Sequence, residues 1–203
     1  MIITHQKGRG KKIHLLIDGE YQVTTDVDFW AENYIKDGTE INEKEWKNLF
    51  EAVQYRKAVN KAADLLSRRD HSVKELRDKL IRTVDPQSAD KAIEKMLEFG
   101  YLDDEKYAKS LIKYLVDTKH YSVSHVRQEC FKRGIDRDIV QQFLDEDEPD
   151  NVSNALALIE GKYRMKLSQE NGREKVIAAL MRKGFSYGDI KSALYRFENG
   201  DEE

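Results

Sequence analysis

Cysteine and proline are scarce in this sequence. Only one of the 203 residues is cysteine and only two are proline. A single cysteine excludes an intramolecular disulfide framework and is compatible with a reducing compartment. The scarcity of proline suits long helices, because proline removes a backbone donor inside a helix. We therefore expect a mainly helical chain without disulfide bonds.

Long apolar runs are also missing. The longest, over residues 176–181, is far shorter than the roughly 20 residues that a helix needs to cross a bilayer. The first residues, Met1 to His5, lack the apolar core of a signal peptide. We expect a soluble, cytoplasmic protein with no membrane partner.

Patterns typical of catalysis and of metal binding are absent as well. The histidines His71, His120 and His125 have no cysteine or carboxylate at a metal-ligand spacing. The basic loop over residues 7–12 lacks the spacing of a phosphate-cradling loop, and we interpret it as a solvated turn. No Ser/His/Asp arrangement or convincing carboxylate pair occurs. The sequence predicts no enzyme, no cofactor and no metal site.

The first 50 residues predict a small β element followed by a helix. A strand is expected over residues 2–6, and another over 12–17, where apolar residues partly alternate. Asp18-Gly19 is typical of a tight hairpin turn, after which a strand over residues 21–25 returns. A short helix is expected over residues 26–34.

A long helix is expected to follow and to run to about residue 69. It begins at Asn42, which forms a predicted capping box with Glu45, so that each side chain binds the other residue's amide. Its second half starts a series of repeats.

The strongest structural pattern is an internal repeat of about fifty residues. Apolar residues recur at equivalent positions of three segments, and Cys130 occupies one of these positions, so we interpret it as a small core residue. Glycine followed by an apolar residue and a helix cap recurs between helices, at Gly100, Gly134 and Gly184. The two equivalent sets of core positions are Leu76, Val126 and Val176, and Leu80, Cys130 and Leu180.

These patterns predict a mainly α fold. Tandem three-helix repeats would form an elongated array, preceded by a small N-terminal β-hairpin and helix. Further caps are predicted at Ser72 with Glu75, at Asp85 before a proline, and at Asp103. The predicted parts are an extension over residues 1–50, repeats over 51–102, 103–148 and 149–198, and an acidic tail over 199–203.

Charge is unevenly distributed, although the formal net charge is only −3. The helical segments carry 11 Lys and Arg against 8 Asp and Glu in residues 56–102, 8 against 4 in 106–144, and 9 against 4 in 151–197. Acidic residues gather in the connectors over 103–105 and 145–150 and in the tail over 198–203. Basic units between acidic connectors favour an anionic partner.

Twelve basic residues of these segments are candidates for contact with that partner. Each one fits a solvated helix face equally well, because i,i+4 ion pairs and cations in a last turn stabilise helices slightly. The sequence leaves both interpretations open at any single position, but all three segments share the positive sign. The candidates are Arg68, Arg69, Lys74, Arg77, Arg127, Lys132, Arg133, Lys162, Arg164, Lys166, Arg182 and Lys183.

Five tyrosines lie among these basic residues, a pattern that occurs where bases of single-stranded nucleic acid stack on aromatic rings. They are Tyr101, Tyr107, Tyr114, Tyr121 and Tyr163. For Tyr101 and Tyr107 we expect burial instead, because they fall at predicted helix-packing positions.

The stretch Gly100-Tyr101-Leu102-Asp103-Asp104, with Tyr107-Ala108 after it, resembles the signature of the RecX family of recombination regulators. The preceding helix over residues 72–80 and the tandem three-helix repeats are similar to that family, and the resemblance covers about residues 55–197. It implies a non-enzymatic protein that binds the RecA recombinase. Family members are understood to lie in the groove of the filament of RecA on single-stranded DNA, where they modulate filament growth, ATP hydrolysis and strand exchange, usually as inhibitors.

On this basis we expect a monomer that regulates the RecA filament, most often by inhibition, with direct contact to single-stranded DNA left open. An alternative is a helix-turn-helix protein that reads duplex DNA, with the helix over residues 122–133 in a major groove. A nuclease that uses acidic residues is a more distant alternative. Repetition of three similar basic units favours tracking along a filament over a single reading helix.

Overall fold

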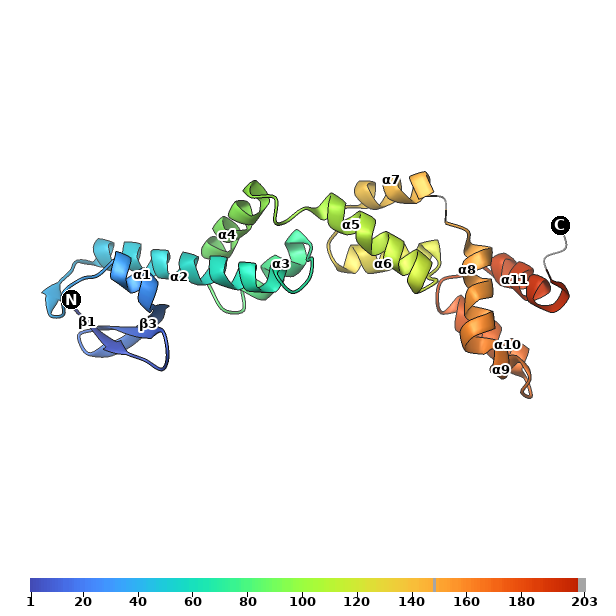
Figure 1. Cartoon of the computed structure of the whole chain (residues 1–203), viewed down its shortest axis with the longest axis horizontal. Coiled ribbons are helices and arrows are strands. Elements are labelled where there is room, and N and C mark those ends of the chain that lie inside the picture. Colours follow the sequence, from blue (N-terminus) through green and yellow to red (C-terminus); the bar gives the residue numbers. More distant parts are fainter. Residues whose placement is uncertain (148, 201–203) are drawn as a thin grey trace. The chain divides into compact units, whose positions relative to one another are not determined.

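The computed structural model describes residues 1–147 and 149–200 of the chain (Figure 1). The chain divides into two units, Met1–Leu102 and Asp103–Glu203, and hydrophobic cores form within each of them. The predicted acidic connector includes Glu148 and the predicted acidic tail includes residues 201–203, so these parts of the prediction lie outside the described residues.

A four-stranded antiparallel sheet begins the first unit, in the order β3-β2-β1-β4. The three strands and the hairpin turn expected from the sequence are present, and Asp18 and Gly19 in the turn have positive φ values of 50° and 84°. The sequence does not predict β4, because a two-residue strand is too short to show an alternation of apolar and polar side chains. The strands are β1 (Ile2–Lys7), β2 (Lys12–Ile17), β3 (Glu20–Asp26) and β4 (Thr39–Glu40).

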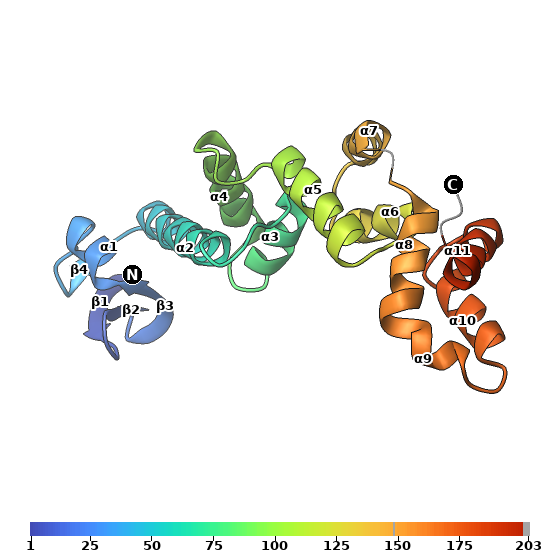
Figure 2. The same ribbon diagram turned by 45° about the vertical axis from the view of Figure 1, so that its right-hand side comes forward.

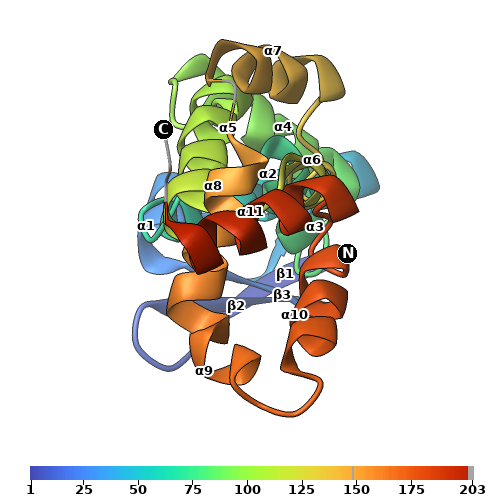
Figure 3. The ribbon, with the colours of Figure 1, turned by 90° about the vertical axis from the view of Figure 1, so that its right-hand side faces the viewer.

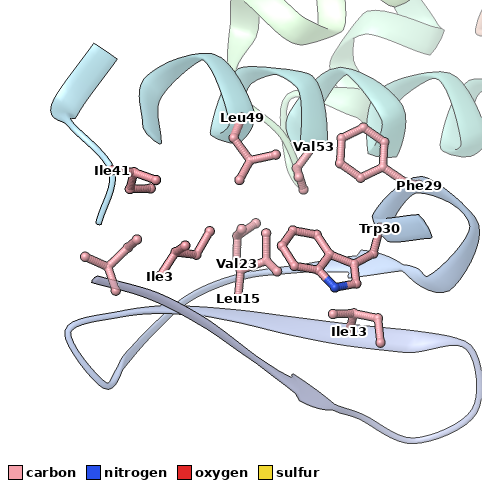
Figure 4. Packing of buried hydrophobic residues seen from close by; sticks show 10 residues of the cluster. Ile3, Ile13, Leu15, Val23, Phe29, Trp30, Ile41, Leu49 and Val53 are labelled. Atoms are coloured by element: carbon pink, nitrogen blue, oxygen red, sulfur yellow. The ribbon is translucent and has the colours of Figure 1, made fainter. Parts of the chain in front are cut away.

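Helix α1 (Val27–Glu32) and the first half of α2 (Glu43–Leu66) cover one face of this sheet. Phe29 and Trp30 of α1 are buried in the core between the sheet and α2 (Figure 4). The Asp26 carboxylate caps α1 by accepting a hydrogen bond from the Phe29 amide at 2.8 Å. The short helix expected after the third strand is therefore present, although it ends at Glu32 rather than at residue 34.

Helix α2 contributes to two hydrophobic cores. Its residues Leu49 and Val53 pack in the core of the sheet, whereas Ala58 and Ala62 pack in the core of the first three-helix repeat. One continuous helix of 24 residues thus belongs both to the N-terminal element and to the first repeat.

The helix caps predicted from the sequence are confirmed. In each of them a side-chain oxygen accepts a hydrogen bond from an amide of the first helical turn, where backbone donors have no partner within the helix. The caps are Asn42 to the Glu45 amide (2.9 Å), Ser72 to the Glu75 amide (3.0 Å), Asp85 to the Ser88 amide (2.9 Å) and Asp103 to the Lys106 amide (2.9 Å).

Three-helix repeats make up the rest of both units (Figures 2 and 3). The first consists of the second half of α2 with α3 (Val73–Leu80) and α4 (Pro86–Glu98). A π-helical turn, η1 or η2, follows the first helix of each later repeat, and in the third repeat η2 continues directly into the short α9. The second repeat contains α5 (Asp104–Lys113), η1 (Tyr114–Thr118), α6 (Val123–Lys132) and α7 (Arg137–Asp147), and the third contains α8 (Asn151–Leu158), η2 (Ile159–Tyr163), α9 (Arg164–Leu167), α10 (Gly172–Met181) and α11 (Tyr187–Asn199).

The equivalent core positions of the repeats are confirmed, because all six residues are fully buried. Each lies on α3, α6 or α10 and belongs to the hydrophobic core of its own repeat. Burial raises the pKa of the Cys130 thiol to about 11. Since only a thiolate is nucleophilic, Cys130 serves as a core residue, as its alignment with leucines predicts.

The glycines between helices have the left-handed conformation that the sequence predicts. Gly100, Gly134 and Gly184 have φ values of 69°, 75° and 81°. Leu102, after the first of them, is buried as expected, but Tyr101 is 70% exposed. The prediction that Tyr101 packs between helices is therefore wrong, because the left-handed residue before it turns its side chain to solvent while Leu102 fills the join.

Candidate nucleic-acid interface

Arg77 of the first repeat forms a two-bonded ion pair with Asp90 of α4. Its Nε donates to Asp90 Oδ1 at 2.7 Å, and its Nη2 donates to Asp90 Oδ2 at 3.2 Å. The hydrogen bond from Arg77 lowers the pKa of the Asp90 carboxyl group. Arg77 therefore contributes to joining α3 to α4, and its charge is largely balanced within the protein.

The three other candidates of the first repeat also have acidic partners. Pairs of this exposed kind contribute little to stability, but they reduce the net positive charge of the surface. Arg68 pairs with Asp64 (2.9 Å), Lys74 with Asp78 (2.6 Å) and Arg69 with Glu75 (3.4 Å). The structure thus favours the solvated-face interpretation in the first repeat.

In the second repeat, the candidates are held by three different kinds of partner. Lys132 pairs with Glu129 at 2.7 Å, while Arg127 donates from Nη2 to the side-chain oxygen of Gln141 at 3.0 Å. The half-buried Arg133 donates to the Tyr107 hydroxyl at 2.8 Å. Tyr107 is buried, as the sequence predicts, and this bond satisfies its polar end.

The third repeat differs from the other two. Within residues 1–147 and 149–200, no carboxylate lies at ion-pair distance from any of its five candidates. All five are in or next to η2, α9 and the end of α10. They are Lys162, Arg164, Lys166, Arg182 and Lys183.

Two of these cations lie beside aromatic rings, and the Lys162 ammonium is 5.8 Å from the centre of the Tyr163 ring. The Lys183 ammonium lies 5.2 Å from the centre of the Tyr121 ring, and that ring is 4.3 Å from the ring of His125. Burial and the neighbouring Lys162 both lower the pKa of Lys183. We call Tyr121, His125, Lys162 and Lys183 the seam cluster, because it joins the second and third repeats. An anion bound there would relieve the repulsion between the two ammonium groups.

A buried hydrogen bond brings the two sides of the seam cluster together. The Ser122 hydroxyl donates to the backbone carbonyl of Lys183 at 2.7 Å and accepts from the His125 amide at 3.1 Å. A β-carbon on Gly184 would lie 2.8 Å from the Ser122 oxygen. Glycine at this position is therefore required both by its positive φ and by the close approach of α6.

Side chains of α8 hold the same junction from another direction. The Asn151 side chain accepts a hydrogen bond from the Val123 amide at 3.0 Å, and the buried Asn154 donates to the Tyr121 carbonyl at 3.3 Å. These bonds tie the start of α6 to the third repeat, so the backbones that carry Tyr121 and Lys183 have a defined relative position.

The tyrosines proposed for stacking differ in their accessibility. Tyr114 in η1 is partly exposed and lies 5.3 Å from the Lys119 ammonium, whereas Tyr163 in η2 is buried in the core of the third repeat. Tyr101 is exposed, and Tyr121 is half-buried beside Lys183. The Lys162 ammonium lies 5.8 Å from the centre of the Tyr163 ring, but that ring is buried. Tyr121 is therefore the more accessible of the two rings that adjoin a candidate cation without an acidic partner among the described residues.

Sequence reasoning identifies Tyr121 and Lys183 separately but does not bring them together. Helical periodicity relates residues within a few turns of one helix, and these two are 62 positions apart. The one feature of the sequence that the two residues share is that each directly adjoins a predicted helix boundary, Tyr121 at Ser122 and Lys183 at Gly184.

In the part of the chain that the structure describes, no group of three or more His, Cys, Asp or Glu side chains is arranged to hold a metal ion. None of its helices is both long and apolar enough to cross a membrane.

The chain matches three models of one protein family, in the order in which the repeats occur. Residues 58–96 match the model described as "RecX, first three-helix domain", residues 103–144 match the second and residues 148–194 match the third.

Curated relatives over nearly the whole chain carry the name "Regulatory protein RecX". That of Clostridioides difficile is 26% identical over 203 residues, which cover 98% of this chain and 96% of the relative. That of Caldanaerobacter subterraneus is 28% identical over 197 residues, which cover 96% and 98% of the two chains.

Two crystal structures show the same fold. A structure of regulatory protein RecX aligns with a TM-score of 0.62 and 23% identity, and covers 93% of this chain and 96% of the other. A structure of RecX from Lactobacillus salivarius aligns with a TM-score of 0.59 and 24% identity, and covers 72% and 98% of the two chains.

Proposed function

This chain belongs to the RecX family of regulatory proteins, and from that premise we propose that it binds RecA assembled on single-stranded DNA and restrains the filament. The restraint is non-enzymatic: by occupying the filament, the protein slows its growth, its ATP hydrolysis and its strand exchange. RecA regulation is the part of this proposal that the family membership supports directly.

The observation that carries the proposal is the set of five cations in the third repeat for which the described residues offer no acidic partner. A surface that keeps its own carboxylates away from its lysines and arginines is suited to a partner that supplies negative charge. That negative charge would come from the phosphates of single-stranded DNA or from carboxylates on the surface of RecA. The paired cations of the first repeat are expected to contribute less, because they would first have to leave Asp64, Asp78 and Asp90.

Tyr121 and His125 give the seam cluster a second mode of contact. Their rings are tilted by 54° with centres 4.3 Å apart, and Lys183 lies beside them. An aromatic ring next to a cation suits a nucleotide, because the base can stack while the phosphate pairs with the ammonium. Such stacking contributes about 1–3 kcal/mol per base.

The test measures RecA ATP hydrolysis on single-stranded DNA while the protein is titrated at two salt concentrations. We expect inhibition below one protein per RecA, weakened by salt. Doubly substituted Lys162→Gln/Lys183→Gln protein should need about tenfold more protein for half-inhibition, which corresponds to the loss of about 1.4 kcal/mol.

Arg68→Gln/Lys74→Gln protein is the matched control, because it also loses two positive charges. It should inhibit nearly as well as the unsubstituted protein. Equal losses in both variants would show that net charge matters and the seam cluster does not. Absence of any effect on RecA, with tight binding to one duplex sequence, would instead support the helix-turn-helix alternative.

A further inference from the structure

A cleft lies between α6 and α7, within the second unit and apart from the seam cluster. Its volume is about 370 Å³, enough to admit one bulky side chain. We call it the α6–α7 cleft. It is lined by Arg127, Gln128 and Phe131 of α6, by Arg137, Val140 and Gln141 of α7, and by Ile135 between the helices.

Phe131 and Arg137 lie at the rim of this cleft. Phe131 is 58% exposed, and the Arg137 guanidinium lies 5.0 Å from the centre of its ring. Arg137 is the first residue of α7, where a positive charge opposes the helix dipole instead of complementing it. An exposed aromatic ring with a stacked arginine is a common combination in protein interfaces.

Arg127 is oriented toward the same cleft by a chain of hydrogen bonds. Its Nη2 donates to the side-chain oxygen of Gln141 at 3.0 Å, and the side-chain nitrogen of Gln141 donates to Asp145 at 2.5 Å. Within the described ranges, neither Arg127 nor Arg137 has a carboxylate at ion-pair distance. The nearby Asp136 carboxylate accepts from the Asp138 amide at 2.8 Å.

We propose that the α6–α7 cleft binds an acidic peptide segment that carries one bulky apolar side chain. Ile135 and Val140 are buried and supply an apolar floor for that side chain, with Phe131 as its wall. Arg127 uses one N–H for Gln141, so both guanidinium groups at the rim retain donors for carboxylates on either side of it. Arginine suits this role because its planar group donates two parallel hydrogen bonds to a carboxylate.

A nucleobase fits this cleft less well than a hydrocarbon side chain does. Each polar atom of the Gln141 side chain already makes one hydrogen bond within the protein, which leaves at most one lone pair and one N–H for the edge of a base. A buried polar edge without partners costs free energy that an apolar side chain does not. The peptide is therefore the occupant that the cleft favours.

This proposal is independent of the seam cluster and of the proposed action on RecA. His125 and Glu129 lie on one flank of α6, toward the seam, whereas Arg127 and Phe131 lie on the other flank. Substitutions in the cleft can therefore be made without altering Lys162 or Lys183, and a failure of one proposal does not imply a failure of the other.

The experiment uses the full chain and a fluorescein-labelled peptide of Asp and Glu residues with one central Phe. Binding is followed by fluorescence anisotropy, and the same peptide with Ser in place of Phe has equal charge. We expect the Phe peptide to bind at least about tenfold more tightly than the Ser peptide, since the cleft buries its ring. Equal affinity for the two peptides, or no binding of either, would overturn the proposal.

Variants of surface residues locate the site. Arg127→Gln and Phe131→Ser should each weaken binding of the Phe peptide by about tenfold, as expected for one lost charge-assisted hydrogen bond or one lost apolar wall. Lys132→Gln is the matched control, because it removes one charge from the same helix on the opposite flank, and it should change the affinity little. An equal effect of Lys132→Gln would indicate non-specific attraction. If Phe131→Ser weakened binding of oligo(dT) but not of the peptide, the cleft would be a nucleotide site.

Discussion

At the scale of the residue, His71 shows how burial controls the charge of a single side chain. It is 2% exposed, and its Nδ1 donates to the Arg69 carbonyl at 2.9 Å. Its Nε2 lies 3.0 Å from the Lys79 ammonium and accepts a hydrogen bond from it, which requires a neutral ring. Burial is the largest cause that lowers the pKa of His71, and the positive charges of Arg69 and Lys79 add to the effect.

We therefore predict that acid destabilises the first unit through His71. The folded-state pKa lies below the unfolded value of about 6.5, so the unfolded chain binds more protons and the free energy of unfolding falls as pH drops below that value. His71→Asn retains a donor for the Arg69 carbonyl but does not titrate. In this variant the free energy of unfolding should therefore fall less steeply as the pH drops. The measurement is the urea midpoint between about pH 7.5 and pH 5.

His120→Asn serves as the control for this prediction. His120 has a φ of 50°, a conformation that asparagine tolerates, so the fold should be preserved. Its variant should keep the acid sensitivity of the unsubstituted chain. If His71→Asn protein lost stability in acid as steeply as the parent does, another group would be responsible.

At the scale of the element, the contact of α6 with the turn after α10 determines where the seam cluster forms. The Ser122 hydroxyl serves as the cap of α6 and also donates to the Lys183 carbonyl. Ser122 is fully buried, so either bond left unmade would leave a backbone group without a partner. One hydroxyl thus fixes both the start of a helix and the position of the neighbouring repeat.

Gly184→Ala should therefore lower the free energy of unfolding by about 1–3 kcal/mol, because it combines backbone strain with a clash against the Ser122 oxygen. Ser122→Ala removes that oxygen, and the double variant should lose less stability than the sum of the two single losses. Urea unfolding of the four proteins measures this coupling. Strictly additive losses would mean that Gly184 is needed only for its φ.

At the scale of the whole molecule, the positive sign of a helical segment distinguishes the repeats less well than whether its candidate cations already pair with carboxylates. All three helical segments are basic in sequence, yet in the first repeat the four candidates are paired with carboxylates, whereas the third leaves all five of its candidates without such a partner among the described residues. The net charge of −3 hides this difference entirely.

The salt dependence of binding should reflect that difference. Each phosphate contact to single-stranded DNA adds a slope of about −0.7 to a plot of log affinity against log salt concentration. Lys162→Gln/Lys183→Gln should therefore make the slope on oligo(dT) shallower by about 1.4, measured by anisotropy with bare and with RecA-coated DNA. A change of slope on RecA-coated DNA alone would mean that these lysines contact RecA and not the DNA. No change of slope on either DNA would mean that they lie outside the interface.

The sequence by itself determined the local structure of this protein. Caps such as Ser72, turn glycines such as Gly134 and core positions such as Leu76 act within one or two helical turns, so their consequences can be predicted from spacing. The mainly α fold, the small β element and the three repeats followed from them, and the boundaries differed by a few residues where helix ends depend on packing.

Only the tertiary structure decided which charges are balanced and which side chains meet. The ion pair of Arg77 with Asp90, the exposure of Tyr101 and the meeting of Tyr121 with Lys183 depend on how one helix docks against another. Docking is set by the fit of buried surfaces, which leaves no regular spacing between the residues it joins. The twelve basic candidates were therefore equivalent in sequence and became distinct only once the helices were packed.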